Sequence, residues 1–315
     1  MSIIKYAIFF VTVAFLAVAF GADPAGRSWN YYYKRAQVQY RGEMLDYALA
    51  SLERCLDLNP RSYQAANLMA EIYTRKNMKQ RAIDSYLVST GINDRQADVH
   101  YRLGELYEFF AERDLAFRHY TRAVEIEPDH IRAHCSLIRI CHARNDPAAA
   151  RRHFETGYRL GMAAAGPLLK QAAEAGRAGD TTGAAALYGR VIDTAPAMVE
   201  AYFSLYEIYR RKGDDANAAA ALEKLVFVKP DHEKAYLFLG NIYFTKQLPG
   251  RRVHLFDRAI ACYKKAFEIN PDNYEACLGI ADVYDFIGRD LDARAWKEKG
   301  MAIEERVEKK RAREN

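Results

Sequence analysis

His130, His134 and Cys141 are the residues whose types and spacing come closest to a metal-binding site. On a helix, residues separated by four and eleven positions, as these are, lie on nearly the same face, and imidazole and thiolate are common metal ligands. His134 and Cys141, however, occupy columns of a repeat, described below, whose other members are apolar. His130 stands where its helix is expected to begin. We therefore interpret these residues as structural and predict no metal.

No other motif in the sequence predicts catalysis. The glycine-rich stretch Gly176–Gly183 lacks the lysine and the preceding strand that a phosphate-binding loop requires. The chain has no HExxH, no CxxC and no serine-nucleophile motif. Its carboxylates are expected on solvated helix surfaces, where none pairs with a histidine or a serine. We predict no catalytic residue, no cofactor and no enzymatic activity.

The five cysteines do not form a disulfide framework, because their number is odd and they are scattered along the chain. Most of them fall on positions expected to face a helical core, where a thiol packs as a small apolar group. Cys262 and Cys277 lie on consecutive predicted helices, and a bridge between them is left open.

The elements that carry these residues follow a 34-residue period. A fixed period in this range indicates stacked supersecondary units. An alanine marks each period, a large ring follows most of these alanines by four positions, and a small residue recurs earlier in several repeats. The alanines are Ala48, Ala82, Ala116, Ala150, Ala184, Ala218, Ala259 and Ala293, the rings Tyr86, Tyr120, Phe154, Tyr188 and Tyr263, and the small residues Ala70, Gly104, Gly240 and Ala281.

Each period predicts two amphipathic helices, because apolar residues recur at spacings of three, four and seven. The small residues would let the two helix axes approach closely, and the ring would fill the gap to the next repeat. Gly179, Gly213 and Gly288 fall between the two helices, where a left-handed backbone is expected. Prolines such as Pro128 and Pro230 close the second helix.

This columnar pattern resembles the tetratricopeptide repeat, and the resemblance covers roughly residues 29–307. It implies an all-α fold, a right-handed superhelical solenoid of about eight 34-residue helix–turn–helix repeats. The repeats are expected to start near residues 29, 63, 97, 131, 165, 199, 233 and 274. Residues 308–315 would form the charged end of a C-terminal capping helix.

Two segments depart from the regular repeat. Seven extra residues, centred on 248–254, lengthen the seventh repeat, and they either extend its second helix or form a protruding turn that touches a partner. The segment Met162–Gly189 is rich in alanine and glycine, which predicts either close packing or a bendable joint. Asp94 and Met162 replace two of the expected prolines.

Residues 1–22 are predicted to be a signal peptide or a membrane anchor, followed by a linker at 23–28. Lys5 precedes the uncharged apolar run Tyr6–Phe20, and small residues follow that run. The run is short for a bilayer span, which needs about 17–25 residues, so a cleaved signal is favoured over an anchor. Either alternative predicts a bacterial protein that is periplasmic, or anchored in the inner membrane and facing the periplasm.

The resemblance implies that first helices line a concave groove that receives an extended peptide or a partner helix. Family members that grip a terminal carboxylate use lysine and asparagine there, whereas this chain places Glu71 and Glu105 at those positions, so a chaperone tail is disfavoured. The predicted groove residues are Asn67, Glu71, Tyr101, Glu105, Arg139, Phe203, Glu207, Arg210, Asn241 and Phe244.

The predicted function is a protein–protein interaction scaffold of a bacterial cell-envelope assembly. The alternative is a ligand- or substrate-handling accessory subunit of a transporter or secretion system. A net charge of +5 without a concentrated basic patch does not favour nucleic acid. Partners are therefore expected to be other proteins, with an N-terminal membrane tether and a homo-oligomer both left possible.

Overall fold

The computed structural model describes residues 27–245 and 252–314, and these residues form fifteen helices and no strand. They divide into a first compact unit, which ends at Ala133, and a second, which begins at His134. The first contains α2 (Trp29–Arg41), α3 (Leu45–Leu58), α4 (Tyr63–Arg75), α5 (Lys79–Ile92), α6 (Ala97–Phe109) and α7 (Arg113–Ile126). α8 (Ile131–Ala143) spans the boundary between the two units.

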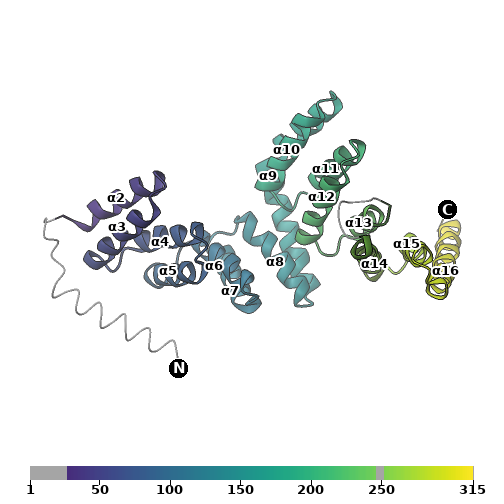
Figure 1. Cartoon of the computed structure of the whole chain (residues 1–315), viewed down its shortest axis with the longest axis horizontal. Helices are drawn as coiled ribbons and strands as arrows, with labels where there is room; N and C mark the ends of the chain where they lie inside the picture. The colour runs from purple at the N-terminus through teal and green to yellow at the C-terminus, as the bar shows by residue number, and fades with distance from the viewer. Residues whose placement is uncertain (1–26, 246–251, 315) are drawn as a thin grey trace. The chain divides into compact units, whose positions relative to one another are not determined.

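The second compact unit contains the remaining helices, each joined to the next by a short connection in most cases (Figure 1). They are α9 (Pro147–Arg177), α10 (Thr181–Thr194), α11 (Val199–Arg211), α12 (Asp215–Val228), α13 (Glu233–Thr245), α14 (Arg252–Ile269), α15 (Tyr274–Phe286) and α16 (Asp290–Glu314). None of the described helices is both long and apolar enough to cross a membrane. The predicted signal or anchor, residues 1–22, lies outside the described residues.

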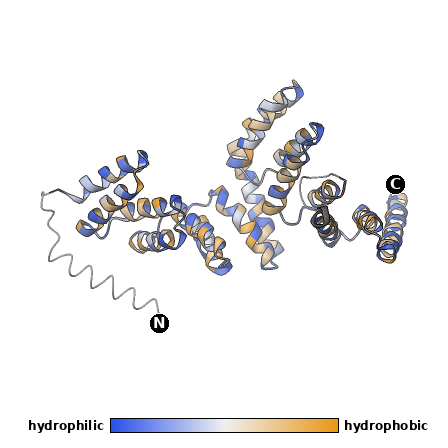
Figure 2. Ribbon diagram, viewed as in Figure 1, coloured by the Kyte–Doolittle hydropathy of each residue, from blue (hydrophilic) through white to orange (hydrophobic). Residues whose placement is uncertain are grey.

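The alanine column is the centre of the helical packing. All eight alanines of the column are 6% exposed or less. An alanine allows two helices to approach closely, and the apolar stripes on either side of it then face each other. Figure 2 shows apolar and polar residues alternating along most helices, as expected for helices with one buried face. The all-α repeat fold is therefore confirmed.

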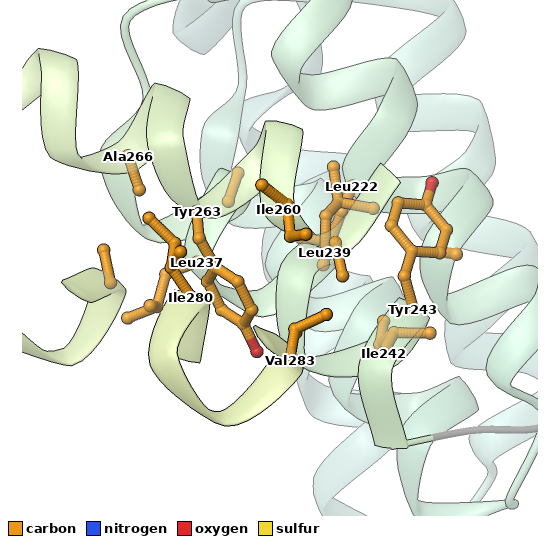
Figure 3. Close-up of a cluster of buried hydrophobic side chains, with 14 of the residues drawn as sticks. Leu222, Leu237, Leu239, Ile242, Tyr243, Ile260, Tyr263, Ala266, Ile280 and Val283 are labelled. Carbon is orange, nitrogen blue, oxygen red and sulfur yellow. The ribbon is translucent and has the colours of Figure 1, made fainter. Parts of the chain in front are cut away.

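The ring and small-residue columns meet in the core. Tyr120 of α7 lies against Gly104 of α6, and a Cβ atom added at Gly104 would come within 2.6 Å of two ring carbons. Tyr263 of α14 lies against both Gly240 of α13 and Gly279 of α15 in the same way. Figure 3 shows the Tyr263 ring among the aliphatic residues of the C-terminal core. The ring thus fills space inside its own repeat as well as toward the next.

The turn between the two helices of a repeat contains one left-handed residue. The predicted Gly179, Gly213 and Gly288 have φ angles of 86°, 71° and 75°. Four non-glycine residues occupy the same position in other repeats: Glu43, Asn77, Ala111 and Asn145, with φ between 55° and 60°. The backbone therefore requires this conformation whether or not the residue favours it.

Ala111→Gly is expected to stabilise the first compact unit by about 1 kcal/mol, because alanine in a left-handed conformation is strained by its Cβ atom. The urea midpoint, followed by circular dichroism, should rise. Gly213→Ala is the matched opposite change in the second unit and should lower its midpoint. An unchanged or lower midpoint for Ala111→Gly would show that the turn carries no such strain.

α9 departs from the expected repeat. It is a single helix of 31 residues, so the repeat start expected near residue 165 lies inside it. Met162 stands where other repeats have a helix-ending proline, and the alanines at 163–165 that follow are the strongest helix formers. Pro167 lies within the helix and leaves one backbone carbonyl without its usual donor. Two helices that would be separate in a regular repeat are fused here.

Part of the seven-residue insertion lengthens a helix. α14 has 18 residues, whereas its counterpart α12 has 14. The rest of the insertion, including the segment in which a protruding turn was left open, falls in residues 246–251 and lies outside the described residues.

Candidate functional site

Four of the predicted groove residues lie in the first compact unit, on the first helices of two consecutive repeats. Asn67 and Glu71 are one turn apart on α4, and Tyr101 and Glu105 are one turn apart on α6. The Tyr101 hydroxyl donates a hydrogen bond to Glu105 at 2.8 Å, and Arg102 Nη1 donates to the same carboxylate at 3.0 Å. Glu105 is therefore engaged within the chain, whereas Glu71 makes no ion pair to another described residue.

Two hollows flank α4 and share Asn67 and Glu71. The first has a volume of about 410 Å³ and lies between α2 and α4. The second has a volume of about 460 Å³ and lies between α4 and the start of α6. Besides the two shared residues, the first hollow is lined by Tyr33, Gln37, Tyr40, Arg41, Gln64 and Leu68. The second is lined by Tyr86, Gln96, Ala97, Asp98, Val99, Arg102 and Glu127.

Sequence reasoning missed most of these lining residues. Gln96 and Glu127 lie at connections between helices, and the repeat pattern assigned groove positions only to the interiors of first helices. Tyr33 and Tyr40 belong to the first repeat, whose first helix fits the pattern loosely. The packing of α2 against α4 brings Tyr33 and Tyr40 into the first hollow, and the sequence pattern does not predict that packing.

Glu71 affects the tyrosines around it. Burial raises the pKa of the Tyr33 and Tyr40 hydroxyls, and the Glu71 carboxylate adds to the shift in both. The Tyr40 ring also lies under the Arg75 guanidinium, 4.2 Å from its centroid. The two hydroxyls therefore remain protonated donors at neutral pH.

The orientation of the Asn67 amide follows from its neighbour Gln96. Gln96 Nε2 donates to the Asn93 carbonyl at 2.6 Å and to Ser89 Oγ at 3.0 Å, so Gln96 Oε1 faces Asn67 and accepts its Nδ2 at 2.6 Å. Asn67 Oδ1 is then buried with no hydrogen-bond partner among the described residues. An unsatisfied buried acceptor costs about 1–3 kcal/mol.

The other six predicted residues lie in the second compact unit, and most are engaged in packing or pairing. The Arg139 guanidinium lies 4.3 Å from the centroid of the Phe227 ring, and Arg210 pairs with Glu207 at 2.8 Å. Asn241 Oδ1 accepts the Tyr263 hydroxyl at 2.7 Å. Phe203 contacts the rings of His232 and Phe238, and Phe244 contacts those of Phe256 and Phe286.

A third hollow, of about 400 Å³, lies in the second compact unit and was not predicted. It forms where α8 and α9 meet the connection between α12 and α13. Lys229 Nζ lies 4.0 Å from the centroid of the Phe154 ring, and His142 Nε2 lies 3.7 Å from Asp231. The segments that meet here are far apart in the sequence, so no local pattern predicts the hollow.

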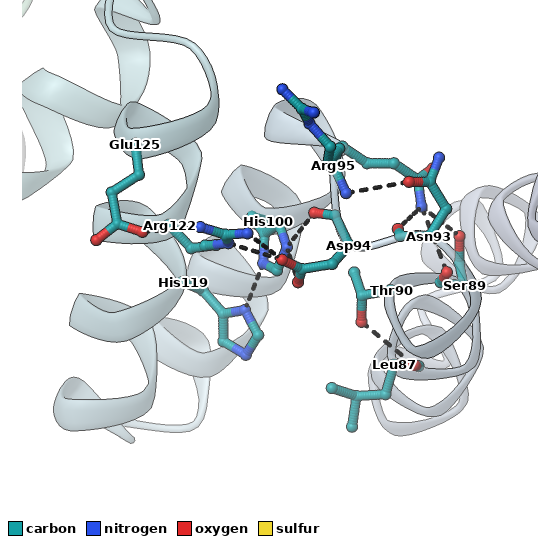
Figure 4. A network of polar contacts seen from close by, with 11 residues as sticks. Leu87, Ser89, Thr90, Asn93, Asp94, Arg95, His100, His119, Arg122 and Glu125 are labelled. Atoms are coloured by element: carbon teal, nitrogen blue, oxygen red, sulfur yellow. Dashed lines mark hydrogen bonds and ion pairs between the residues drawn. The ribbon is translucent and has the colours of Figure 1, made fainter.

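Two histidine pairs, each with one buried and one half-buried member, recur one repeat apart. The Nδ1 atoms of His100 and His119 are 3.0 Å apart, and so are those of His134 and His153, each residue 34 positions after its counterpart. His100 Nε2 contacts two acceptors of Asp94, so it carries a proton and its Nδ1 accepts from His119 (Figure 4). The members of each pair lie 19 positions apart on two helices, so no local motif predicts the pairs.

Burial lowers the pKa of His119 and of His153 to about 4, and the paired histidine contributes in each case. Asp94 and, in the second pair, Asp146 oppose this effect, while Arg152 adds to it. The carboxyl pKa of Asp94 is itself lowered, mainly by its hydrogen bond from Arg122. His119 and His153 are therefore neutral at pH 7.

The histidines of the cluster His130, His134 and Cys141 make hydrogen bonds within the chain. His130 Nδ1 accepts the backbone N–H of Ala133 at 3.1 Å, which caps the start of α8, and His130 Nε2 lies 3.3 Å from Asp98. No group of three or more potential ligands in the described part of the chain is placed to hold a metal ion. All five cysteines, including Cys262 and Cys277, are free thiols.

Helical hairpins that repeat every 34 residues around an alanine column define an α-helical repeat protein. Two models of the tetratricopeptide repeat match the sequence, one at residues 169–231 and the other at 97–130 and 255–273. These matches and the all-α repeat fold support a tetratricopeptide repeat protein. Proteins of this family generally mediate protein–protein interactions.

Several solved structures are similar to the chain. A tetratricopeptide repeat protein from Parabacteroides merdae is 18% identical, with 82% of this chain and 99% of that chain covered and a TM-score of 0.45. PilF of Pseudomonas aeruginosa is 17% identical, with 68% and 97% covered and a TM-score of 0.41. No curated protein sequence matches the chain.

Proposed function

We propose that this protein is an interaction scaffold of a bacterial cell-envelope assembly and that it binds an extended segment of a partner protein along α2, α4 and α6. One observation carries the binding proposal: two hollows adjoin each other across α4 and share Asn67 and Glu71. Two adjoining hollows along consecutive first helices suit an extended peptide rather than a compact small molecule.

The envelope location rests on the sequence of residues 1–22, which has the charged start, apolar middle and small-residue exit of an export signal. In this proposal the repeats hold their partners in the periplasm, either free or tethered by an uncleaved anchor. The alternative function, a ligand-handling subunit of a transporter or secretion system, would use the same hollows for a smaller ligand.

Site-specific photocrosslinking in cells tests the binding surface. A photoreactive residue at Gln64, which lines the first hollow, is expected to give discrete protein adducts. The matched control is Glu53, an exposed residue on α3 that lines none of the described hollows, and it should give none of these adducts. Identical adducts from both positions, or none from Gln64, would contradict the proposed surface.

A reporter enzyme that is active only in the periplasm, fused after Asn315, tests the location independently. Activity is expected with the full chain and should be lost when residues 1–22 are removed. A silent reporter with the full chain would overturn the envelope proposal and leave the binding surface to be judged by crosslinking alone.

A further inference from the structure

The second hollow has more negative than positive charge. Three carboxylates line it, those of Glu71, Asp98 and Glu127, together with one guanidinium, that of Arg102. Arg102 directs its Nη1 to Glu105, which is outside the lining, at 3.0 Å. His130 approaches Asp98 at 3.3 Å but carries no fixed charge. The hollow is therefore rich in hydrogen-bond acceptors and short of donors.

An uncharged acceptor adds to these carboxylates. Asn67 Oδ1 has no donor, and the contacts of Gln96 prevent the amide from turning its nitrogen toward that side. The atom is closed off from solvent in the unliganded chain, so a donor reaches it only when lining side chains move. Half of the side chain of Arg102 is exposed, and it is a lining group that can move aside.

Apolar surface lies beside the acceptors. Ala97, Val99 and the ring of Tyr86 line the same hollow and are buried. A long cationic side chain fits such a hollow. Its methylene stem can pack against the apolar groups, and its charged head can bind the carboxylates. Arginine suits it better than lysine, since a planar guanidinium offers five N–H donors in fixed directions.

We propose that the second hollow is a specificity subsite for a basic residue, arginine before lysine, in the extended segment that the groove binds. This inference rests on the proposed peptide-binding function. Glu71 accepts the guanidinium at the centre of the hollow, Asp98 and Glu127 contribute negative charge at its edge, and Asn67 Oδ1 receives a donor that the chain itself does not supply.

Phage display of random nonapeptides against the full chain tests the subsite. The selected peptides are expected to share arginine or lysine at one position. Their affinities are then measured by fluorescence polarisation, with that residue changed to glutamine or to glutamate. We expect a loss of about tenfold with glutamine and a larger loss with glutamate.

Glu71→Gln should reduce the affinity for the basic peptides about tenfold while leaving the affinity of the glutamine-substituted peptides unchanged. Glu53→Gln on α3 is the control with an equal change of charge and should have no effect. Both residues are exposed, so neither substitution is expected to unfold the chain.

The outcomes separate this inference from the proposed function. Peptides that bind the groove without a basic position, or whose affinity Glu71→Gln does not change, overturn the subsite but leave peptide binding standing. If no peptide is enriched and photocrosslinking from Gln64 also gives no adduct, the proposed function fails and the subsite fails with it.

Discussion

Gly240→Ala is expected to destabilise the second compact unit by about 2 kcal/mol, although alanine is the better helix former. The added Cβ atom would lie 2.5 Å from a ring carbon of Tyr263, which is 2% exposed. The ring has little room to move, because Gly279 of α15 also packs against it. Overpacking of this kind costs about 1–3 kcal/mol or more, and it outweighs the gain of up to about 1 kcal/mol in helix propensity.

Gly189→Ala on α10 is the matched control, since nothing lies within 4 Å of a Cβ atom at that position. It should stabilise the chain by up to about 1 kcal/mol. The urea midpoints of the two variants should therefore move in opposite directions. In a Tyr263→Ala background the cost of Gly240→Ala should disappear. A similar midpoint shift for both glycine variants would show that the ring does not fix the distance between α13 and α14.

Acidification is expected to destabilise both compact units well above the pH at which most carboxyl groups titrate. The folded-state pKa of His119 and of His153 is about 4, below the ordinary value of 6.5. Between these two pH values the unfolded chain therefore binds more protons, and stability falls as the pH falls. The loss approaches about 2–3 kcal/mol for each of these two histidines near pH 4.

Urea unfolding between pH 7.5 and pH 4.5 measures this dependence. His119→Gln should flatten the pH dependence of the first unit, and His153→Gln should flatten that of the second. Each variant is expected to be less stable at neutral pH, because it loses the contact between the two histidines. The quantity to compare is therefore the change in the free energy of unfolding with pH, not the urea midpoint at one pH. An undiminished slope in the double variant would assign the acid sensitivity to other groups.

Most of the fold could be predicted from the sequence because each structural requirement of the repeat recurs. The column Ala48 to Ala293 marks the buried helix contacts, and Gly179, Gly213 and Gly288 mark the left-handed turns. The equivalent turns at Glu43 and Ala111 have no glycine to predict the left-handed conformation. There the packing of the two flanking helices imposes a conformation that these residues do not favour. The 34-residue period therefore predicts where a turn lies even when the residue at that turn does not favour a left-handed backbone.

The candidate site was predictable only in part. Asn67 and Glu71 follow from their register on a first helix, and both line the hollows. The acceptor character of the second hollow, however, depends on which neighbours are already paired. Arg102 pairs with Glu105 and leaves Glu71 without an ion pair, and Gln96 fixes the orientation of the Asn67 amide. The contact between Asn67 and Gln96 joins residues 29 positions apart, and no spacing rule predicts it.

The fusion in α9 bears on how the protein unfolds. In a row of separate repeats each neighbour can fray independently, and stability is roughly a sum over repeats and their interfaces. The N-terminal half of α9 contacts α8 through His153, and its C-terminal half packs on α10. One continuous helix links the two, so they should lose structure together. A shortened chain that ends between residues 147 and 177 would cut a single cooperative element, whereas an end at Gly213 would fall between helices.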